Sequence, residues 1–119
     1  MAMRPAMKRR NVRVVTDSHV GRILFEGTRA VGVEYEKNGV TAQARAGREV
    51  IVSCGSVCSP KLLELSGIGD PSLLSGLGIP VVQANRNVGE NLQDHLGINY
   101  TWKAKRRTLH QLLRPGGGK

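Results

Sequence analysis

The chain has 119 residues, a formal net charge of +9 and only 3% aromatic residues. This length leaves room for one domain, and no stretch reaches the eighteen or more apolar residues that a membrane-spanning helix needs. The positive charge is concentrated in residues 1–22 and 103–119, so we expect a solvated basic tail at each end of a nearly neutral middle, with no membrane insertion.

Segments rich in β-branched residues predict strands at residues 12–16, 20–25, 30–36, 40–45 and 48–53. Short turns separate the middle three, and strands joined in this way must pair antiparallel. We therefore expect a three-stranded β-meander. The first and last strands should pair in parallel with strands outside this sequence, which would leave the chain alone marginally stable or prone to aggregation.

Two short helices are expected after the last of these strands. Ser59 is placed to be an N-cap, Pro60 fits the first helical position, and Gly67 is placed to end the helix in the left-handed conformation. Asp70 and Pro71 repeat the same start for a second helix. Similar helix capping explains the likeness of the two segments better than a solenoid repeat, which would need at least three units.

The remainder of the chain is expected to be mostly extended. Strand candidates lie at 81–82 and 98–102, and a last short helix is expected from about 108 to 113, before a glycine-rich, flexible end.

Two motifs carry the most specific information. The segment from Gly55 to Gly69 has the pattern G-S-x-x-S-P-x-x-L-x-x-S-G-I-G, and residues 87–95 read NVGENLQDH. Both resemble segments of the glucose-methanol-choline (GMC) family of flavin-dependent oxidoreductases, and they occur in the family's order. Residues 19–27 and 30–35 are similar to the β-meander of its FAD domain, so the resemblance covers about residues 11–113.

The resemblance implies an α/β fold, α+β for the isolated fragment, which is part of a Rossmann-like FAD-binding domain. In this interpretation residues 1–10 are a basic tail and 11–69 a partial FAD-binding domain with the meander, a strand and the signature helix. Residues 70–113 would cover FAD and begin the substrate-side region, and residues 114–119 would be the flexible end.

FAD is the cofactor that the resemblance implies. The residues that would contact it are Val20, Cys54, Gly55, Ser56, Asn91, Asp94 and His95. Val20 would pack on the adenine end, residues 54–56 would form a small-residue turn beside the nucleotide half, and the last three would run over FAD toward the substrate. The alternatives stay open: an ordinary strand valine, a structural glycine turn, and hydrogen-bonding turn residues. The family more often has alanine at Cys54.

No residue of this chain is assigned a catalytic role. The sequence contains no G-x-G-x-x-G loop to hold the FAD pyrophosphate on a helix N-terminus, and the family's catalytic histidine lies near a C-terminus that this chain does not match. The resemblance implies a fragment of an FAD-dependent oxidoreductase acting on CH-OH groups, of the alcohol or choline dehydrogenase type. FAD and a small alcohol would be partners of the intact parent, whereas the chain alone is expected to be inactive, and whether to class it as an enzyme stays open.

The alternative is a non-catalytic basic module that binds nucleic acid or anionic surfaces. Aromatic residues are not interleaved with the basic runs as in single-strand binders, so we expect no nucleic-acid partner. Cys54 and Cys58 have neither the Cys-x-x-Cys redox spacing nor partners for zinc, so no metal is expected. Reduced cysteines and a chain without a visible secretion signal favour a cytoplasmic location.

Overall fold

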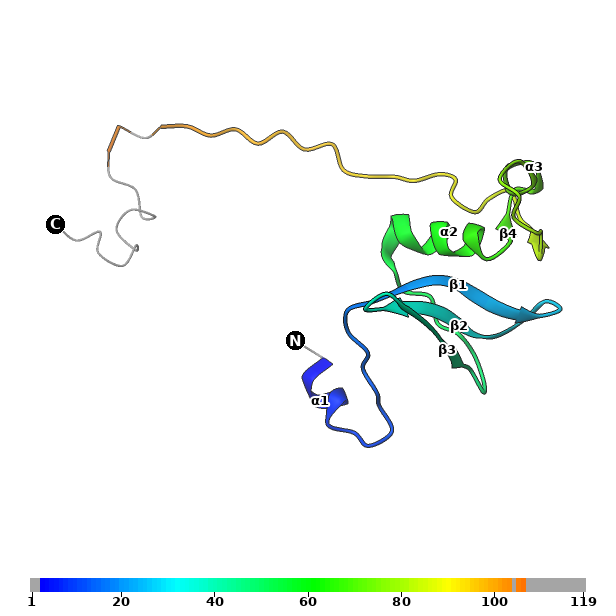
Figure 1. The fold of residues 1–119 in the computed structure, drawn as a ribbon. Helices are drawn as coiled ribbons and strands as arrows, with labels where there is room; N and C mark the ends of the chain where they lie inside the picture. The colour runs from blue at the N-terminus through cyan, green and yellow to red at the C-terminus, as the bar shows by residue number, and fades with distance from the viewer. Residues whose placement is uncertain (1–2, 104, 107–119) are drawn as a thin grey trace.

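The computed structural model describes residues 3–103, 105 and 106. Strands β1 (Ser18–Glu26), β2 (Arg29–Lys37) and β3 (Val40–Arg45) form an antiparallel sheet in that order. Helix α2 (Gly55–Leu65) lies along the β1 side of the sheet, and the short helix α3 (Pro71–Gly76) follows beyond its C-terminal end (Figure 1). The expected β-meander is confirmed.

The two hairpin turns of the sheet follow from local sequence. Gly27 has a φ of 60°, and Asn38 and Gly39 have φ values of 52° and 77°. Asn-Gly with both residues left-handed is the favoured two-residue hairpin turn, because its twist matches that of the flanking strands. These turns set the register, in which Glu26 faces Arg29 and Lys37 faces Val40.

A polar ladder crosses the exposed face of the meander. Nε of Arg22 donates to Oε1 of Glu34 over 2.9 Å, its Nη2 donates to Oε2 over 3.1 Å, and Nε2 of Gln43 donates to Oε2 over 3.3 Å. The hydrogen bond from Arg22, followed by that from Gln43, lowers the pKa of Glu34, and the same pair raises the pKa of Arg22. Because both side chains are at the surface, the pair fixes register more than it adds stability.

The core is small, and its buried apolar side chains come from β1, α2 and α3. Its buried apolar side chains are Ile23, Leu62 and Leu74, with Leu74 at 0% exposure. The buried hydroxyl of Ser66 accepts a hydrogen bond from the backbone N–H of Ile23. The end of α2 is therefore joined to the middle of β1 by both packing and a hydrogen bond.

A second, two-stranded parallel sheet follows α2. Strand β4 (Ile68–Gly69) pairs with β5 (Gln83–Ala84). Gly67, with a φ of 88°, turns the chain from α2 into β4, and its carbonyl accepts from the backbone N–H of Val82 over 2.8 Å and of Gln83 over 3.1 Å. The expected glycine stop of the first helix is confirmed.

Several expected strands are absent from the part of the chain that the structure describes. Residues 12–16, 48–53 and 98–102 have an irregular backbone, because none of them finds a hydrogen-bonding partner strand among the described residues. The strand expected at 81–82 is displaced to 83–84, since the bonds to Gly67 hold residues 82 and 83 at the entry to β5.

The start of the first helix also differs from expectation. Helix α2 begins at Gly55 with Cys54 as its N-cap, so Pro60 lies inside the helix. The hydroxyl of Ser59 accepts from the N–H of Cys54 over 3.0 Å. Ser59 therefore lies inside α2 and accepts a hydrogen bond from the N-cap residue, and its predicted role as the N-cap is wrong. In α3 the prediction is confirmed: Asp70 is the N-cap, its Oδ1 accepts from the N–H of Ser72 over 2.7 Å, and Pro71 is the first residue.

The two ends of the described chain leave the central body. Residues expected to form a basic tail include a short helix, α1 (Met3–Met7). Residues 94–103 are exposed and run away from the helices as an extended segment (Figure 1). The helix expected at 108–113 and the flexible end at 114–119 lie outside the described residues. Among the described helices, none is both long and apolar enough to cross a membrane.

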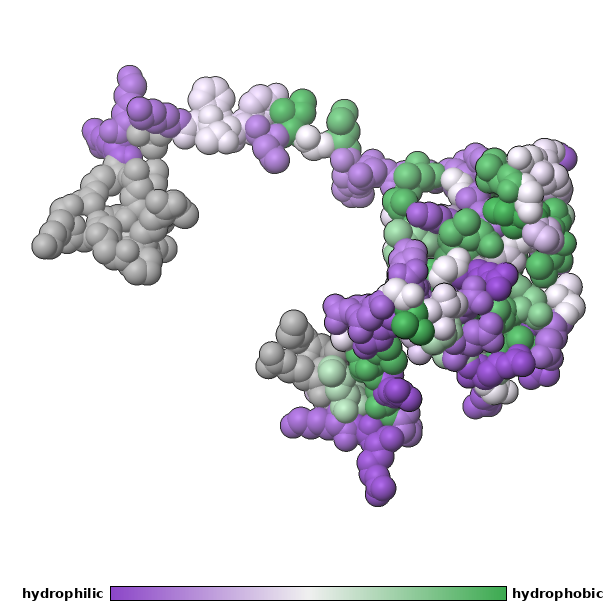
Figure 2. Space-filling view, in the orientation of Figure 1, coloured by the Kyte–Doolittle hydropathy of each residue, from purple (hydrophilic) through white to green (hydrophobic). Residues whose placement is uncertain are grey.

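Much apolar surface remains uncovered. Figure 2 shows apolar side chains gathered over α2 and α3, with hydrophilic ones over the outer part of the meander. Exposed apolar residues on these helices and their flanks include Ile51, Val57, Leu73, Leu77 and Val81. A surface of this kind is typical of a part that packs against further polypeptide.

Candidate functional site

The N-terminal end of α2 is open and carries small residues. Gly55 has a φ of 88°, and a Cβ placed on it would meet no other atom within 4 Å. Cys54 makes no side-chain hydrogen bond to the helix that it caps, and the first turn contains no acidic residue. The backbone N–H groups of the first turn lack partners within the helix, so this end can donate hydrogen bonds to an anion or a polar ligand.

A groove runs beside this helix end. It has a volume of about 370 Å³ and lies between the first half of α2 and the segment that follows β5. Its lining residues are Ser56, Pro60, Gly89, Glu90, Asn91, Leu92 and Gln93. A second hollow of about 220 Å³ shares part of this lining and reaches Lys61 and Glu64 farther along the helix. The two hollows form one continuous face of α2.

Turns in residues 85–91 bring the second wall to the helix. The N–H of Asn87 donates to Oδ1 of Asn85 over 3.0 Å, and Asn91 and Gly89 have φ values of 57° and 84°. Gly89 lies against α2, since a Cβ placed on it would stand 3.1 Å from Oε1 of Glu64. Glycine is required here by both the backbone conformation and the close approach.

The structure brings together some of the predicted cofactor residues. Ser56 and Asn91 line the same groove although they are far apart in sequence, and Gly55 precedes Ser56 at its edge. Cys54 caps the helix next to them and is exposed. These four residues form the candidate site, which we call the α2 groove together with its other lining residues.

The other predicted residues lie elsewhere. Val20 is half-buried in β1 and faces Tyr35 of β2. Asp94 and His95 are on the exposed extended segment, beyond the residues that line the α2 groove. The Asp94 carboxylate accepts from the backbone N–H of His95 over 2.7 Å, so it serves the local backbone in this structure.

Sequence reasoning missed several residues of the α2 groove. The sequence predicts Pro60 as the first helical residue, but Pro60 lies inside α2 and lines the α2 groove. Gly89, Leu92 and Gln93 are within the motif at 87–95, yet the turn that folds this motif onto α2 was not expected. Gly89 itself was the available signal, because glycine often marks a turn with a left-handed backbone.

The arrangement is suited to binding. The α2 groove offers hydrogen-bonding groups from Ser56, Asn91 and Gln93 and one carboxylate from Glu90, and its described lining contains no histidine. No group of three or more metal-ligating side chains occurs among the residues that the structure describes. Cys54 and Cys58 are both free and exposed.

Known proteins share both the sequence and the fold. The family model described as GMC oxidoreductase matches residues 1–97. The mitochondrial choline dehydrogenase of Homo sapiens is 52% identical over 115 residues, which are 95% of this chain and 19% of that protein. The chain therefore spans about a fifth of the length of this curated relative.

Two solved structures carry the fold comparison. A formate oxidase has a TM-score of 0.72 and 37% identity, covering 74% of this chain and 16% of the other. An FAD-dependent oxidoreductase from Chaetomium thermophilum has a TM-score of 0.67 and 35% identity, covering 70% of this chain and 15% of the other. The α/β fold with its antiparallel meander is thus shared with much longer oxidoreductases.

Proposed function

This chain belongs to the GMC oxidoreductase family, and from that premise we propose that it forms part of an FAD-binding domain, beside the nucleotide half of the cofactor. The observation that carries the proposal is the α2 groove, where Ser56 and Asn91 meet at an open helix start. The parent protein is proposed to oxidise a CH-OH group of a small alcohol of the choline type, in line with the relative named choline dehydrogenase.

The residues of the α2 groove fit such a cofactor. The nucleotide half of FAD carries phosphates and ribose hydroxyls, which need hydrogen-bond donors and a close backbone approach. Gly55 leaves open space where a side chain would stand, and the helix start has N–H groups without a side-chain cap. Asn91 and Gln93 add amide groups from the opposite wall.

The remaining predicted residues have a secondary place in the proposal. Val20 in β1 would contribute an apolar contact, and Cys54 a small side chain at the edge of the groove. Asp94 and His95, on the exposed segment after the groove, would reach the cofactor when further polypeptide packs against that segment.

In this proposal the cofactor supplies the redox chemistry, and the residues of this chain supply binding and orientation. Bound FAD would supply the hydride acceptor for the oxidation of the alcohol. The residues described here bind and orient: the first turn of α2 donates hydrogen bonds, and the wall at 89–93 shields one side of the site from water. No proton-transfer role is proposed for any residue of this chain.

A chimaera tests the proposal. The 115-residue segment of human choline dehydrogenase that aligns with this chain is replaced by the present sequence, and the purified protein is assayed for bound FAD by absorbance and for choline oxidation. Ser56→Leu would place a larger, apolar side chain in the α2 groove and is expected to lower FAD content at least tenfold. The matched control is Ser75→Leu, on the exposed face of α3, which should retain FAD.

If the Ser56→Leu chimaera keeps the FAD content of the parent chimaera, the α2 groove does not border the cofactor. If the parent chimaera folds with native circular dichroism but carries no FAD, this chain does not supply a working part of an FAD-binding domain.

A further inference from the structure

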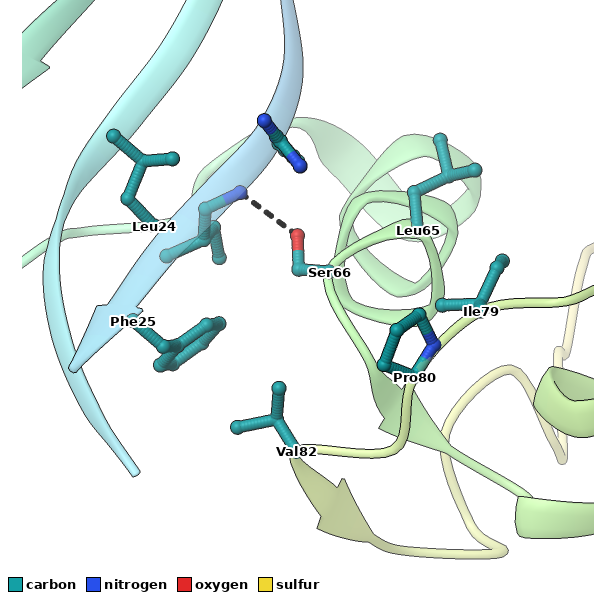
Figure 3. A pocket seen from close by; sticks show the side chains of 9 residues that line it. Leu24, Phe25, Leu65, Ser66, Ile79, Pro80 and Val82 are labelled. Atoms are coloured by element: carbon teal, nitrogen blue, oxygen red, sulfur yellow. Dashed lines mark hydrogen bonds between the residues drawn. The ribbon is translucent and has the colours of Figure 1, made fainter. Parts of the chain in front are cut away.

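Ser66 sits where α2 ends and meets the sheet. It is 7% exposed, and its Oγ accepts from the backbone N–H of Ile23 over 2.8 Å. The same hydroxyl donates to the carbonyl of Leu62 over 2.6 Å. Figure 3 shows Ser66 directed from the helix toward β1, at a groove of about 290 Å³ whose wall includes Phe25, Leu65 and Val82.

The Ser66 hydroxyl supplies a hydrogen-bond partner to both the N–H of Ile23 and the carbonyl of Leu62. Ile23 lies on β1, an edge strand of the meander, and its N–H points away from β2, where no strand of the described chain is paired with it. In the last turn of α2 the N–H of Ser66 bonds to the carbonyl of Leu63 over 3.0 Å. The carbonyl of Leu62, the usual acceptor for this N–H in an α-helix, takes the hydroxyl instead.

A hydroxyl is the side-chain group that can do both jobs in this small space. It donates one hydrogen bond and accepts another, whereas a methyl group would leave a buried N–H without a partner. Packing of α2 on β1, where Leu62 and Ile23 are buried, brings the two elements together but is not directional. The hydrogen bond fixes which residue of β1 faces the end of the helix.

We propose that Ser66 is a positioning residue that sets the place of α2 on β1 and, through the helix, the distance between Val20 and the α2 groove. The part concerning the α2 groove and Val20 rests on the proposed function. Ser56 is ten residues from Ser66, so it is about 15 Å away along the helix axis. A tilt of about 10° around the Ser66 end would move Ser56 by about 3 Å, enough to spoil contacts to a ligand held from both elements.

Amide hydrogen exchange on the full 119-residue chain tests the bond directly, without any flavin. In the parent chain the Ile23 N–H is expected to be protected from exchange. The informative variants are Ser66→Thr and Ser66→Val, which have the same shape and differ in a hydroxyl against a methyl group. We expect the protection factor of Ile23 to be roughly five- to a hundredfold lower in Ser66→Val than in Ser66→Thr.

A second readout reports position. The chemical shifts of the Ser56 and Val20 amides should stay close to those of the parent in Ser66→Thr and move in Ser66→Val, and Ser75→Ala serves as an exposed serine control. Equal protection of Ile23 in the two variants would overturn the proposal, as would unchanged Ser56 and Val20 shifts in Ser66→Val. If both variants unfold, exchange is measured on the parent chain alone. Rapid exchange of the Ile23 N–H, while the amides that pair β1 with β2 are protected, would show that the bond to Ser66 does not form and would overturn the proposal. Because no cofactor is present, failure here is separate from failure of the FAD chimaera.

Discussion

Gly67 offers a sharp test of the packing between α2, β4 and β5. Its φ of 88° is left-handed, and a Cβ placed on it would stand 2.9 Å from Cγ2 of Val82 and 3.1 Å from the Val82 nitrogen. Gly67→Ala therefore combines two costs. The left-handed conformation costs about 1–2 kcal/mol for a residue with a Cβ, and forcing Val82, just before β5, away from the new Cβ adds about 1–3 kcal/mol.

Two other glycines separate these costs. Gly78 has a φ of 70° but open space around it, so Gly78→Ala should lose only about 1 kcal/mol after the gain from a stiffer unfolded chain. Gly76, at the end of α3, has open space and no left-handed φ. Gly76→Ala should be neutral or stabilise by about 0.5 kcal/mol. The expected order of stability is Gly76→Ala, then Gly78→Ala, then Gly67→Ala.

The assay is urea unfolding followed by far-ultraviolet circular dichroism. Trimethylamine N-oxide in all samples raises the stability of a small core into a measurable range. Midpoints are compared at a shared slope, because a changed slope would report a changed unfolded or folded state. If Gly67→Ala is as stable as Gly78→Ala, the close packing of Gly67 on Val82 is not part of the folded chain in solution.

Three further outcomes follow from the contacts described above. Leu74→Ala should lower the free energy of unfolding by about 2–5 kcal/mol, because the Leu74 side chain is fully buried. Leu73 is half-exposed, so Leu73→Ala should lower it by under about 1 kcal/mol. Similar losses in the two variants would contradict the burial of Leu74 in the core. Because the pKa of Glu34 is lowered in the folded chain, its pairing with Arg22 stabilises the fold above pH 4.5, and this stabilisation is lost as the pH falls through the folded-state pKa. NMR titration of the Glu34 carboxyl should give a higher titration midpoint in Arg22→Gln than in the parent chain. An unchanged midpoint would refute the pairing. The isolated chain mixed with FAD should leave gel filtration without flavin absorbance, and retained absorbance would show that the fragment holds the cofactor alone.

The meander was predictable because its determinants are local. Asn38 and Gly39 encode a hairpin turn by themselves, and the flanking residues alternate in the way that a sheet requires. The start of α3 was predictable for the same reason, since Asp70 caps the N–H of a residue two positions away. Short-range chemistry of this kind can be read from a single sequence.

Other parts depend on contacts that sequence does not display. Whether residues 12–16 and 48–53 form strands depends on partner strands, and the described chain supplies none. Helix α2 starts at Gly55, earlier than the sequence predicted, because the hydroxyl of Ser59 accepts a hydrogen bond from the N–H of Cys54. The α2 groove exists because turns at 85–91 return to the helix, so its wall could not be assembled from the motif at 87–95 alone.

The separation between hydrogen-bonded partners has a consequence for how the chain folds. Each strand of the meander is joined to the next by a two-residue turn, so its closure costs little chain entropy, and hairpins of this kind form in microseconds. The bond from Ile23 to Ser66 spans 43 residues. We therefore expect the meander to assemble first and to act as a template on which α2 docks later, which makes docking of the helix the slow step of folding for this segment.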